Sequence, residues 1–336
     1  MIESYDGVAP FKVAEFWSSL PESDSYSEVS DVAVDGADRV YLLTRGLSRV
    51  IVYDRNGEFV TAWGEDVLSA RPHGLSIAGD GSLYVVDEGA HQIVHFDSDG
   101  RILAVIGTGR ASNTGHDFRQ ATLEDKLNTI SASAGPFNLP TAVVEGPRGD
   151  LYATDGYGNA RVHRFERDTG RLLQSWGEPG TGEGQFRVPH GLVVASGGRV
   201  IVADRENDRL QVFDLDGAFV AEWRDVQRPS AIAVDFDGNL LVAEIAWFSG
   251  ERSFRKGMVE KMLPARLSLL DGETGAVLGR WSEVNDGSGP GGLLSPHGIA
   301  LDSAGNLYVG EVNASFGLGR SGVATGLNKF QRFRRA

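Results

Sequence analysis

The sequence lacks cysteine altogether. This absence excludes a disulfide framework, and it excludes a thiolate as a nucleophile or a metal ligand. No stretch approaches the ~20 consecutive apolar residues that a membrane-spanning helix requires. The N-terminal segment 1–6 has neither a basic start nor an apolar run. We therefore expect no secretory signal and a cytoplasmic protein.

Positive charge is also scarce, with 32 Lys and Arg against 46 Asp and Glu and a formal net charge of −14. Nucleic acids and anionic membranes bind basic faces, so neither is expected as a partner.

No long stretch repeats apolar residues at i, i+3, i+4 and i+7, which argues against a helical fold. A hydrophobic content of 41% and 44 glycines are typical of a turn-rich protein, and we expect a single domain over residues 1–336.

What the chain does contain is a repeated unit of four short apolar segments, clearest at residues 188–223. Each segment is rich in Val, Ile, Leu and aromatic residues and is bounded by Gly, Asp or Asn. Such segments are typical of antiparallel strands joined by tight turns, and four of them make one propeller blade. The unit occurs six times, which predicts an all-β, six-bladed β-propeller.

The two ends of the chain are expected to share one blade. Segment 11–17 resembles the fourth strand of a blade, whereas the final unit, which begins at Pro296, stops after a third strand. We therefore expect residues 11–17 to complete blade six. Two other units carry long insertions, 108–138 and 246–264, and long loops in compact domains commonly cover or border functional sites.

Three histidines stand in a Pro-His-Gly tripeptide at the start of alternate units: His73, His190 and His297. The first strand of a blade lines the central channel, so the three imidazoles are expected to converge at one mouth of it. Three histidines with open coordination positions are the pattern of catalytic zinc, although iron, cobalt or copper can occupy the same ligands. The alternative is that histidine merely fits a turn after proline. The other histidines show no such register and are expected to be structural or to lie at the surface: His91, His95, His116 and His163.

A second candidate position follows the residue that closes the second strand of a unit, which is an acid in the last five units and Thr44 in the first. Arg45 and Arg205 occupy equivalent places there, and Tyr157 lies one residue further on in its own unit. Arginine can bind a carboxylate in a bidentate pair, and a tyrosine near a dication can accept a proton. Two strand-closing acids are expected to pair inside their blades, Asp155 with Arg161 and Asp204 with Arg209.

The repeats and the residues within them resemble those of known protein families. The units resemble NHL repeats, and three stretches are similar to the peptidyl-α-hydroxyglycine α-amidating lyase family. The similar stretches comprise residues 140–143 with 155–161, 188–192 with 203–213, and 295–299 with 307–311.

The resemblance implies roles for single residues. His73, His190 and His297 match the zinc ligands of the family, Tyr157 the proposed catalytic base, Arg205 the arginine beside it, and Arg45 an arginine of the pocket. The implied reaction cleaves the C–N bond of an N-acyl hemiaminal, such as an α-hydroxyglycine, to an amide and glyoxylate or another aldehyde. The implied substrate is a small molecule or short peptide that carries a carboxylate.

The chain also departs from that family at three positions. Gly158 replaces a disulfide-forming cysteine, Gly298 replaces an aspartate that helps to bind a structural calcium ion, and Ser295 replaces a methionine near the metal. A structural Ca²⁺ is therefore not expected. With no secretory signal, peptide-hormone amidation is not expected either.

Two other functions stay open at this stage, and the sequence does not predict an oligomeric state. One is a zinc-dependent hydrolase of an ester, lactone or amide, with Glu88, Glu244 or Glu311 as general base. The other is a non-catalytic NHL interaction platform, which predicts no bound metal, because propellers host many functions.

Overall fold

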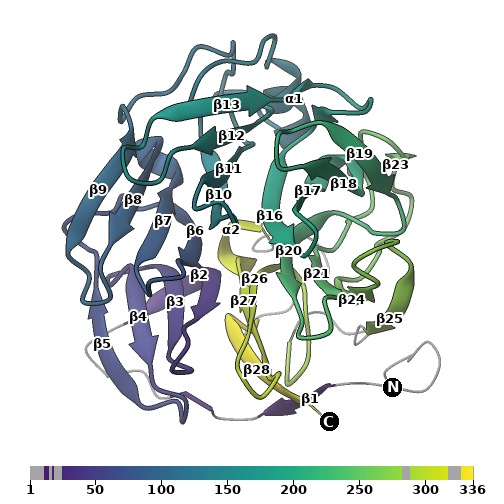
Figure 1. The fold of residues 1–336 in the computed structure, drawn as a ribbon. Coiled ribbons are helices and arrows are strands. Elements are labelled where there is room, and N and C mark those ends of the chain that lie inside the picture. The colour runs from purple at the N-terminus through teal and green to yellow at the C-terminus, as the bar shows by residue number, and fades with distance from the viewer. Residues whose placement is uncertain (1–10, 15–16, 19–24, 282–287, 317–326, 336) are drawn as a thin grey trace. The chain divides into compact units, whose positions relative to one another are not determined.

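The structure is a computed structural model that describes residues 11–14, 17–18, 25–281, 288–316 and 327–335. Six four-stranded antiparallel sheets make the six blades of a β-propeller, as the repeats predict (Figure 1). Within the described residues, no helix has the length and apolar character needed to cross a membrane.

The strands follow the chain order within each of the first five blades. Blade one comprises β2 (Tyr26–Val34), β3 (Val40–Gly46), β4 (Val50–Tyr53) and β5 (Phe59–Trp63), and blade two comprises β6 (Pro72–Ile77), β7 (Leu83–Asp87), β8 (Gln92–Phe96) and β9 (Ile102–Gly107). Blade three comprises β10 (Pro140–Glu145), β11 (Leu151–Asp155), β12 (Arg161–Phe165) and β13 (Leu172–Trp176), and blade four comprises β16 (Pro189–Ala195), β17 (Arg199–Asp204), β18 (Arg209–Asp214) and β19 (Phe219–Trp223). Blade five comprises β20 (Pro229–Val234), β21 (Leu240–Glu244), β24 (Arg266–Leu270) and β25 (Val277–Trp281).

Blade six takes its strands from both ends of the chain: β26 (Pro296–Leu301), β27 (Leu307–Glu311), β28 (Phe330–Arg335) and β1 (Phe11–Ala14). β1 pairs antiparallel with β28, from Phe11 opposite Arg335 to Ala14 opposite Arg332. The N-terminal strand therefore completes the last blade, as predicted. Of the predicted segment 11–17, residues 11–14 form the strand, and residues 15–16 lie outside the described part of the chain.

The chain forms two compact units, each of three blades. The first contains Met1–Pro72, Ser230–Trp247 and Met262–Ala336, and the second contains His73–Pro229 and Phe248–Lys261. Within each unit the core lies between neighbouring blades. Tyr84 of blade two packs with Phe137 and Phe165, for example, in one buried cluster of the second unit. Burying a side chain of this size contributes about 1.5–3 kcal/mol.

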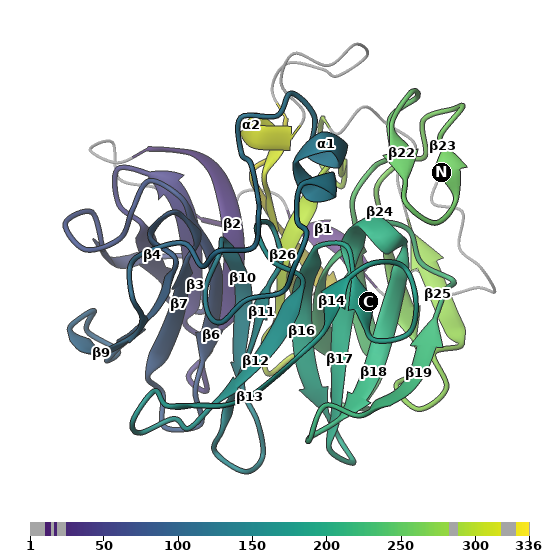
Figure 2. The ribbon, with the colours of Figure 1, turned by 90° about the horizontal axis from the view of Figure 1, so that it is seen from above.

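Both insertions contribute structure to the second unit. Residues 108–138 contain the short helix α1 (Leu123–Asn128), and residues 248–261 contain a hairpin of β22 (Arg252–Ser253) and β23 (Gly257–Met258). Figure 2 shows α1 and this hairpin at the same end of the strands of this unit. The smaller elements are β14 (Glu178–Pro179), β15 (Gln185–Phe186), α2 (Asn313–Phe316) and two 3₁₀ turns at Glu88–Ala90 and Arg205–Asn207.

Candidate metal centre

The predicted histidines follow a proline on the first strand of their blades: His73 on β6, His190 on β16 and His297 on β26. The pairing of β16 with β17 is irregular at this point, with a register shift between Pro189 and Leu192, and blade six shows a similar shift. A bulge re-aims a side chain, and proline is tolerated there because its missing N–H breaks no ladder bond.

The glycines after His73 and His297 are required by close packing. A Cβ atom at Gly74 would lie 2.5 Å from the Thr141 carbonyl oxygen, and one at Gly298 would lie 2.4 Å from the Asp31 Cα. The fold therefore accounts for the proline and the glycine of the tripeptide. It does not require an imidazole between them, because blades one, three and five carry Asp, Thr and Ser at that position. This favours a functional role for the histidines.

Backbone carbonyls fix the orientation of two of the rings. His73 Nδ1 lies 2.7 Å from the Thr141 carbonyl oxygen, and His297 Nδ1 lies 2.6 Å from the Ser30 carbonyl oxygen. A carbonyl only accepts hydrogen bonds, so Nδ1 carries the proton in both rings and Nε2 carries the lone pair when the ring is neutral. Metal-binding histidines commonly have this second partner, which sets the tautomer and the ring orientation.

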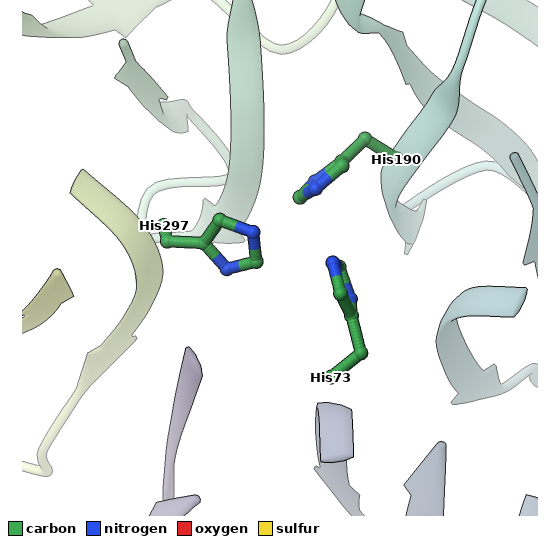
Figure 3. Close-up of side chains that lie close together, drawn as sticks. All are labelled: His73, His190 and His297. Atoms are coloured by element: carbon green, nitrogen blue, oxygen red, sulfur yellow. The ribbon is translucent and has the colours of Figure 1, made fainter. Parts of the chain in front are cut away.

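The three side chains form one group. Ring nitrogens of His73, His190 and His297 lie within 4.8 Å of one another, and all three residues are buried, at 2%, 2% and 4% exposure (Figure 3). Buried imidazole nitrogens suit zinc and other divalent transition metals, whereas Ca²⁺ and Mg²⁺ prefer oxygen ligands. The group could therefore hold a metal ion, as the alternating tripeptides predict.

Tyr157 meets two of these histidines within the second unit. Its hydroxyl oxygen lies 3.2 Å from His73 Nε2 and 3.1 Å from His190 Nε2. Arg205 donates from Nη1 to the same oxygen at 2.8 Å, and its guanidinium carbon lies 5.0 Å from the centre of the tyrosine ring. The structure thus brings the predicted Tyr157 and Arg205 together with two of the predicted ligands.

Arg205 is charged although it is buried, with 3% exposure. Burial lowers the pKa of the guanidinium, but the neighbouring Tyr157 and Glu206 outweigh this effect and raise it overall. Glu206 accepts from Arg205 Nε at 2.8 Å. A fixed cation at this place stabilises negative charge on the Tyr157 oxygen.

Arg45 belongs to the first unit and has a carboxylate partner of its own. Its Nη1 donates to Glu28 Oε1 at 2.7 Å and to Ser315 Oγ at 2.9 Å. The binding of a substrate carboxylate by Arg45 stays a prediction.

The acids that close the second strands have structural roles. Glu311 accepts from the backbone N–H groups of Leu294 and Ser295, at 2.9 and 3.2 Å. Burial raises the pKa of Glu311 to about 7. Glu244 pairs with Arg266 at 2.8 Å. These contacts disfavour both glutamates as the general base of a hydrolase.

Asp155 and Arg161 lie opposite each other on β11 and β12, but of the two predicted internal pairs only the other forms a direct ion pair. Asp204 and Arg209 form a buried ion pair at 2.8 Å, as predicted. Arg161, however, donates to the Ser175 carbonyl oxygen instead of Asp155. Asp155 accepts hydrogen bonds from other groups. The 108–138 insertion brings the Asn138 backbone N–H to it, and the Asn159 side chain and His163 Nε2, at 3.3 Å, are its other partners.

The remaining histidines with resolved contacts are structural. His163 is fully buried and contacts Ser175, His95 lies 2.8 Å from the Ser82 hydroxyl, and His91 accepts from the Leu139 N–H. Sequence reasoning missed two features beside Tyr157. One is the row of charges that begins at Glu206, and the other is an apolar cluster of Leu127, Ile130 and Val188 against which Leu123, Tyr157 and Phe254 pack. The only sequence signal for the first was the polar run Asp-Arg-Glu-Asn that begins at Asp204, the last residue of β17.

Comparison with known proteins gives three relatives of interest. The NHL repeat matches residues 70–96 and 186–213. NHL repeat-containing protein 3 of Mus musculus is 30% identical over 300 residues, which cover 84% of this chain and 76% of that protein. Peptidylglycine alpha-amidating monooxygenase of Rattus norvegicus is 32% identical over 275 residues, 79% of this chain but 25% of that protein. Peptidyl-alpha-hydroxyglycine alpha-amidating lyase 1 of Drosophila melanogaster is 28% identical over 173 residues, 48% of this chain and 29% of that protein.

The first of these relatives matches along most of both chains, the repeats match at two blades, and the six sheets have the strand order of propeller blades. The chain therefore belongs to the family of NHL-repeat β-propellers that includes NHL repeat-containing protein 3.

Proposed function

We propose that the protein is a metal-dependent lyase that cleaves the C–N bond of an N-acyl hemiaminal to an amide and an aldehyde. For an α-hydroxyglycine substrate the aldehyde is glyoxylate. The observation that carries this proposal is the Tyr157 hydroxyl, which lies within 3.2 Å of two imidazoles and 2.8 Å from a buried guanidinium. Relatives named as amidating lyases support the same reaction class.

His73, His190 and His297 are the residues that would hold the metal. Zinc is the expected ion, since it favours tetrahedral imidazole ligation with one open position, and other divalent transition metals accept the same ligands. A bound metal would supply a Lewis acid for the substrate hydroxyl oxygen.

Tyr157 would take the proton of that hydroxyl. Arg205 holds the tyrosine oxygen by a hydrogen bond and stabilises its anionic form, so that it can act as a general base. As the proton leaves, the C–O bond becomes the C=O bond of the aldehyde. The electrons of the C–N bond pass to the nitrogen, which receives the proton that Tyr157 had taken and departs as the amide.

Arg45 is proposed to bind the carboxylate of the substrate. Its guanidinium already pairs with Glu28, an arrangement that fixes the direction of its donors. The substrate is accordingly a small molecule or short peptide with a carboxylate beside the hemiaminal carbon.

The experiment that tests this function measures metal content by mass spectrometry and glyoxylate release from an N-acyl-α-hydroxyglycine. We expect about one zinc per chain in the wild type, and loss of both metal and activity in His190→Ala. His116→Ala is the matched control, because His116 lies outside the histidine group, and it should retain both.

A metal-free wild type that cannot be reloaded would contradict the proposal and favour an interaction platform. A metal-loaded wild type that hydrolyses esters or lactones but releases no glyoxylate would favour the hydrolase.

A further inference from the structure

A row of four alternating charges leads away from Tyr157 within the second unit. Arg205 Nε lies 2.8 Å from Glu206 Oε1, and the same oxygen lies 3.2 Å from Arg228 Nε. Arg228 Nη1 then lies 2.8 Å from Glu251 Oε2. The first three side chains are about 4%, 3% and 4% exposed, and that of Glu251 is 21% exposed.

The order of the charges explains how a cation can stay beside Tyr157. A buried guanidinium without a counter-charge is strongly unfavourable. Glu206 supplies that charge on the Nε side of Arg205, which leaves Nη1 directed at the tyrosine oxygen. Glu206 is in turn compensated by Arg228. Burial raises the pKa of Glu206, but Arg228 and Arg205 outweigh this effect and lower it overall, so the carboxylate stays ionised.

Residues 248–261, the part of the 246–264 insertion that belongs to the second unit, hold this row at its far end and at the backbone of Glu206. Glu251 belongs to the insertion and also accepts from the Phe248 N–H at 3.0 Å. The Phe254 N–H donates to the Glu206 carbonyl oxygen at 3.2 Å, so the insertion fixes the backbone of Glu206 as well. The Phe254 side chain packs in the same apolar cluster as Tyr157.

We propose that Glu206 and Arg228 are positioning residues that hold Arg205 against the Tyr157 hydroxyl, with the 248–261 insertion as their anchor. The insertion is then a fixed support of the tyrosine and not a cover that leaves the site. The effect on catalysis rests on the proposed lyase function, whereas the positioning of Arg205 can be measured without it.

The test compares Glu206→Gln with Glu206→Asp and with the control Arg266→Gln. The glutamine keeps an acceptor oxygen but removes the charge, whereas the aspartate keeps the charge. We expect Glu206→Gln to bind metal like the wild type, to lower kcat by at least about tenfold and to change KM by less than about threefold. Glu206→Asp should recover most of that loss.

Arg266→Gln breaks an ion pair of the same 2.8 Å length in blade five. It should lower the melting temperature without lowering kcat, which separates positioning from general destabilisation. If Glu206→Gln fails to fold, Arg228→Gln takes its place, because it leaves Glu206 paired with Arg205. The proposal is overturned if the variant that folds, Glu206→Gln or Arg228→Gln, has the kcat of the wild type. It is also overturned if Arg266→Gln lowers kcat by as much as that variant does.

A crystal structure of the same variant gives the readout that is independent of activity. We expect the Arg205 guanidinium to withdraw from hydrogen-bond distance of the Tyr157 oxygen. A guanidinium that stays in place would overturn the proposal. A wild type without glyoxylate release would contradict the lyase function alone, and the crystal structure would still decide the role of Glu206.

Discussion

The hydroxyl oxygen of Tyr157 is the atom on which three side chains of the second unit converge: His73, His190 and Arg205. Its ring is held separately, by edge-on contacts with both histidine rings and by the apolar cluster around Leu127. The oxygen can therefore be removed without removing the ring contacts, which makes its role measurable.

Tyr157→Phe should lower kcat by about 10²–10⁴-fold, the range typical of a lost general base. Metal content and melting temperature should stay close to those of the wild type, because the ring packing is retained. Tyr152→Phe is the matched control: Tyr152 lies on β11 of the same blade, and its hydroxyl donates to the Leu215 carbonyl oxygen at 2.9 Å. A Tyr157→Phe enzyme with the activity of the control would remove Tyr157 from the mechanism.

Glu311 should make the stability of the protein depend on pH. Its folded-state pKa, raised to about 7 by burial, lies above its ordinary value of 4.5, so folding favours the protonated carboxyl. The resulting stability is complete below about pH 4.5 and disappears as the pH rises to 7, a loss on the order of 3 kcal/mol.

Urea unfolding between pH 4.5 and 8 checks this dependence. Glu311→Gln cannot ionise at this position. As the pH rises across that window, the unfolding free energy of the wild type should therefore fall relative to that of the variant, and the difference should level off above it. Parallel pH profiles would show that the carboxyl titrates normally.

Single residues also mark where sequence reasoning succeeds and where it ends. The Pro-His-Gly register indicated His73, His190 and His297, because a tripeptide repeated at fixed places in a blade maps onto equivalent places in space. Arg228 and Glu251 carried no such signal. Their partners come from other segments of the chain, and a buried ion pair between distant segments leaves no periodic trace in the sequence.

Among the elements, the blade strands were predictable and the insertions were not. Strands β11, β17 and β27 end at the acids Asp155, Asp204 and Glu311, where the apolar runs end in the sequence. Helix α1 and the hairpin β22–β23 are too short to show a hydrophobic period. Contact with the blades, and not local propensity, stabilises such short elements.

Leu127→Ala tests whether helix α1 supports the site. Leu127 is 1% exposed in the cluster that contains Tyr157, so its truncation should lower the free energy of unfolding by about 2–4 kcal/mol. It should also lower kcat, because the tyrosine loses part of its packing.

Phe118→Ala serves as the control from the same insertion. Phe118 is 72% exposed, so its truncation should lower the free energy of unfolding by less than about 0.5 kcal/mol. Unfolding in urea and steady-state kinetics measure the two effects. A Leu127→Ala protein as stable and active as the control would show that the insertion packs loosely on the blades.

For the whole molecule, the number of blades followed from counting repeats, and the closing strand followed from a fourth strand missing at one end and present at the other. The period specifies a structural unit, and each unit buries its faces only against its neighbours, so the count of units determines the architecture. The single-domain organisation over residues 1–336 stays a prediction.

The pairing of β1 with β28 also sets the order of events when the protein is made. β1 is synthesised before every other strand of the propeller, whereas its partner strand β28 is synthesised after all of them. Blades one to five can form from consecutive segments during translation, whereas blade six cannot be completed until β28 has been synthesised. Until then β1 has no partner strand, and an unpaired strand edge invites pairing with other chains. The nascent chain therefore exposes an unpaired strand throughout the synthesis of the first five blades.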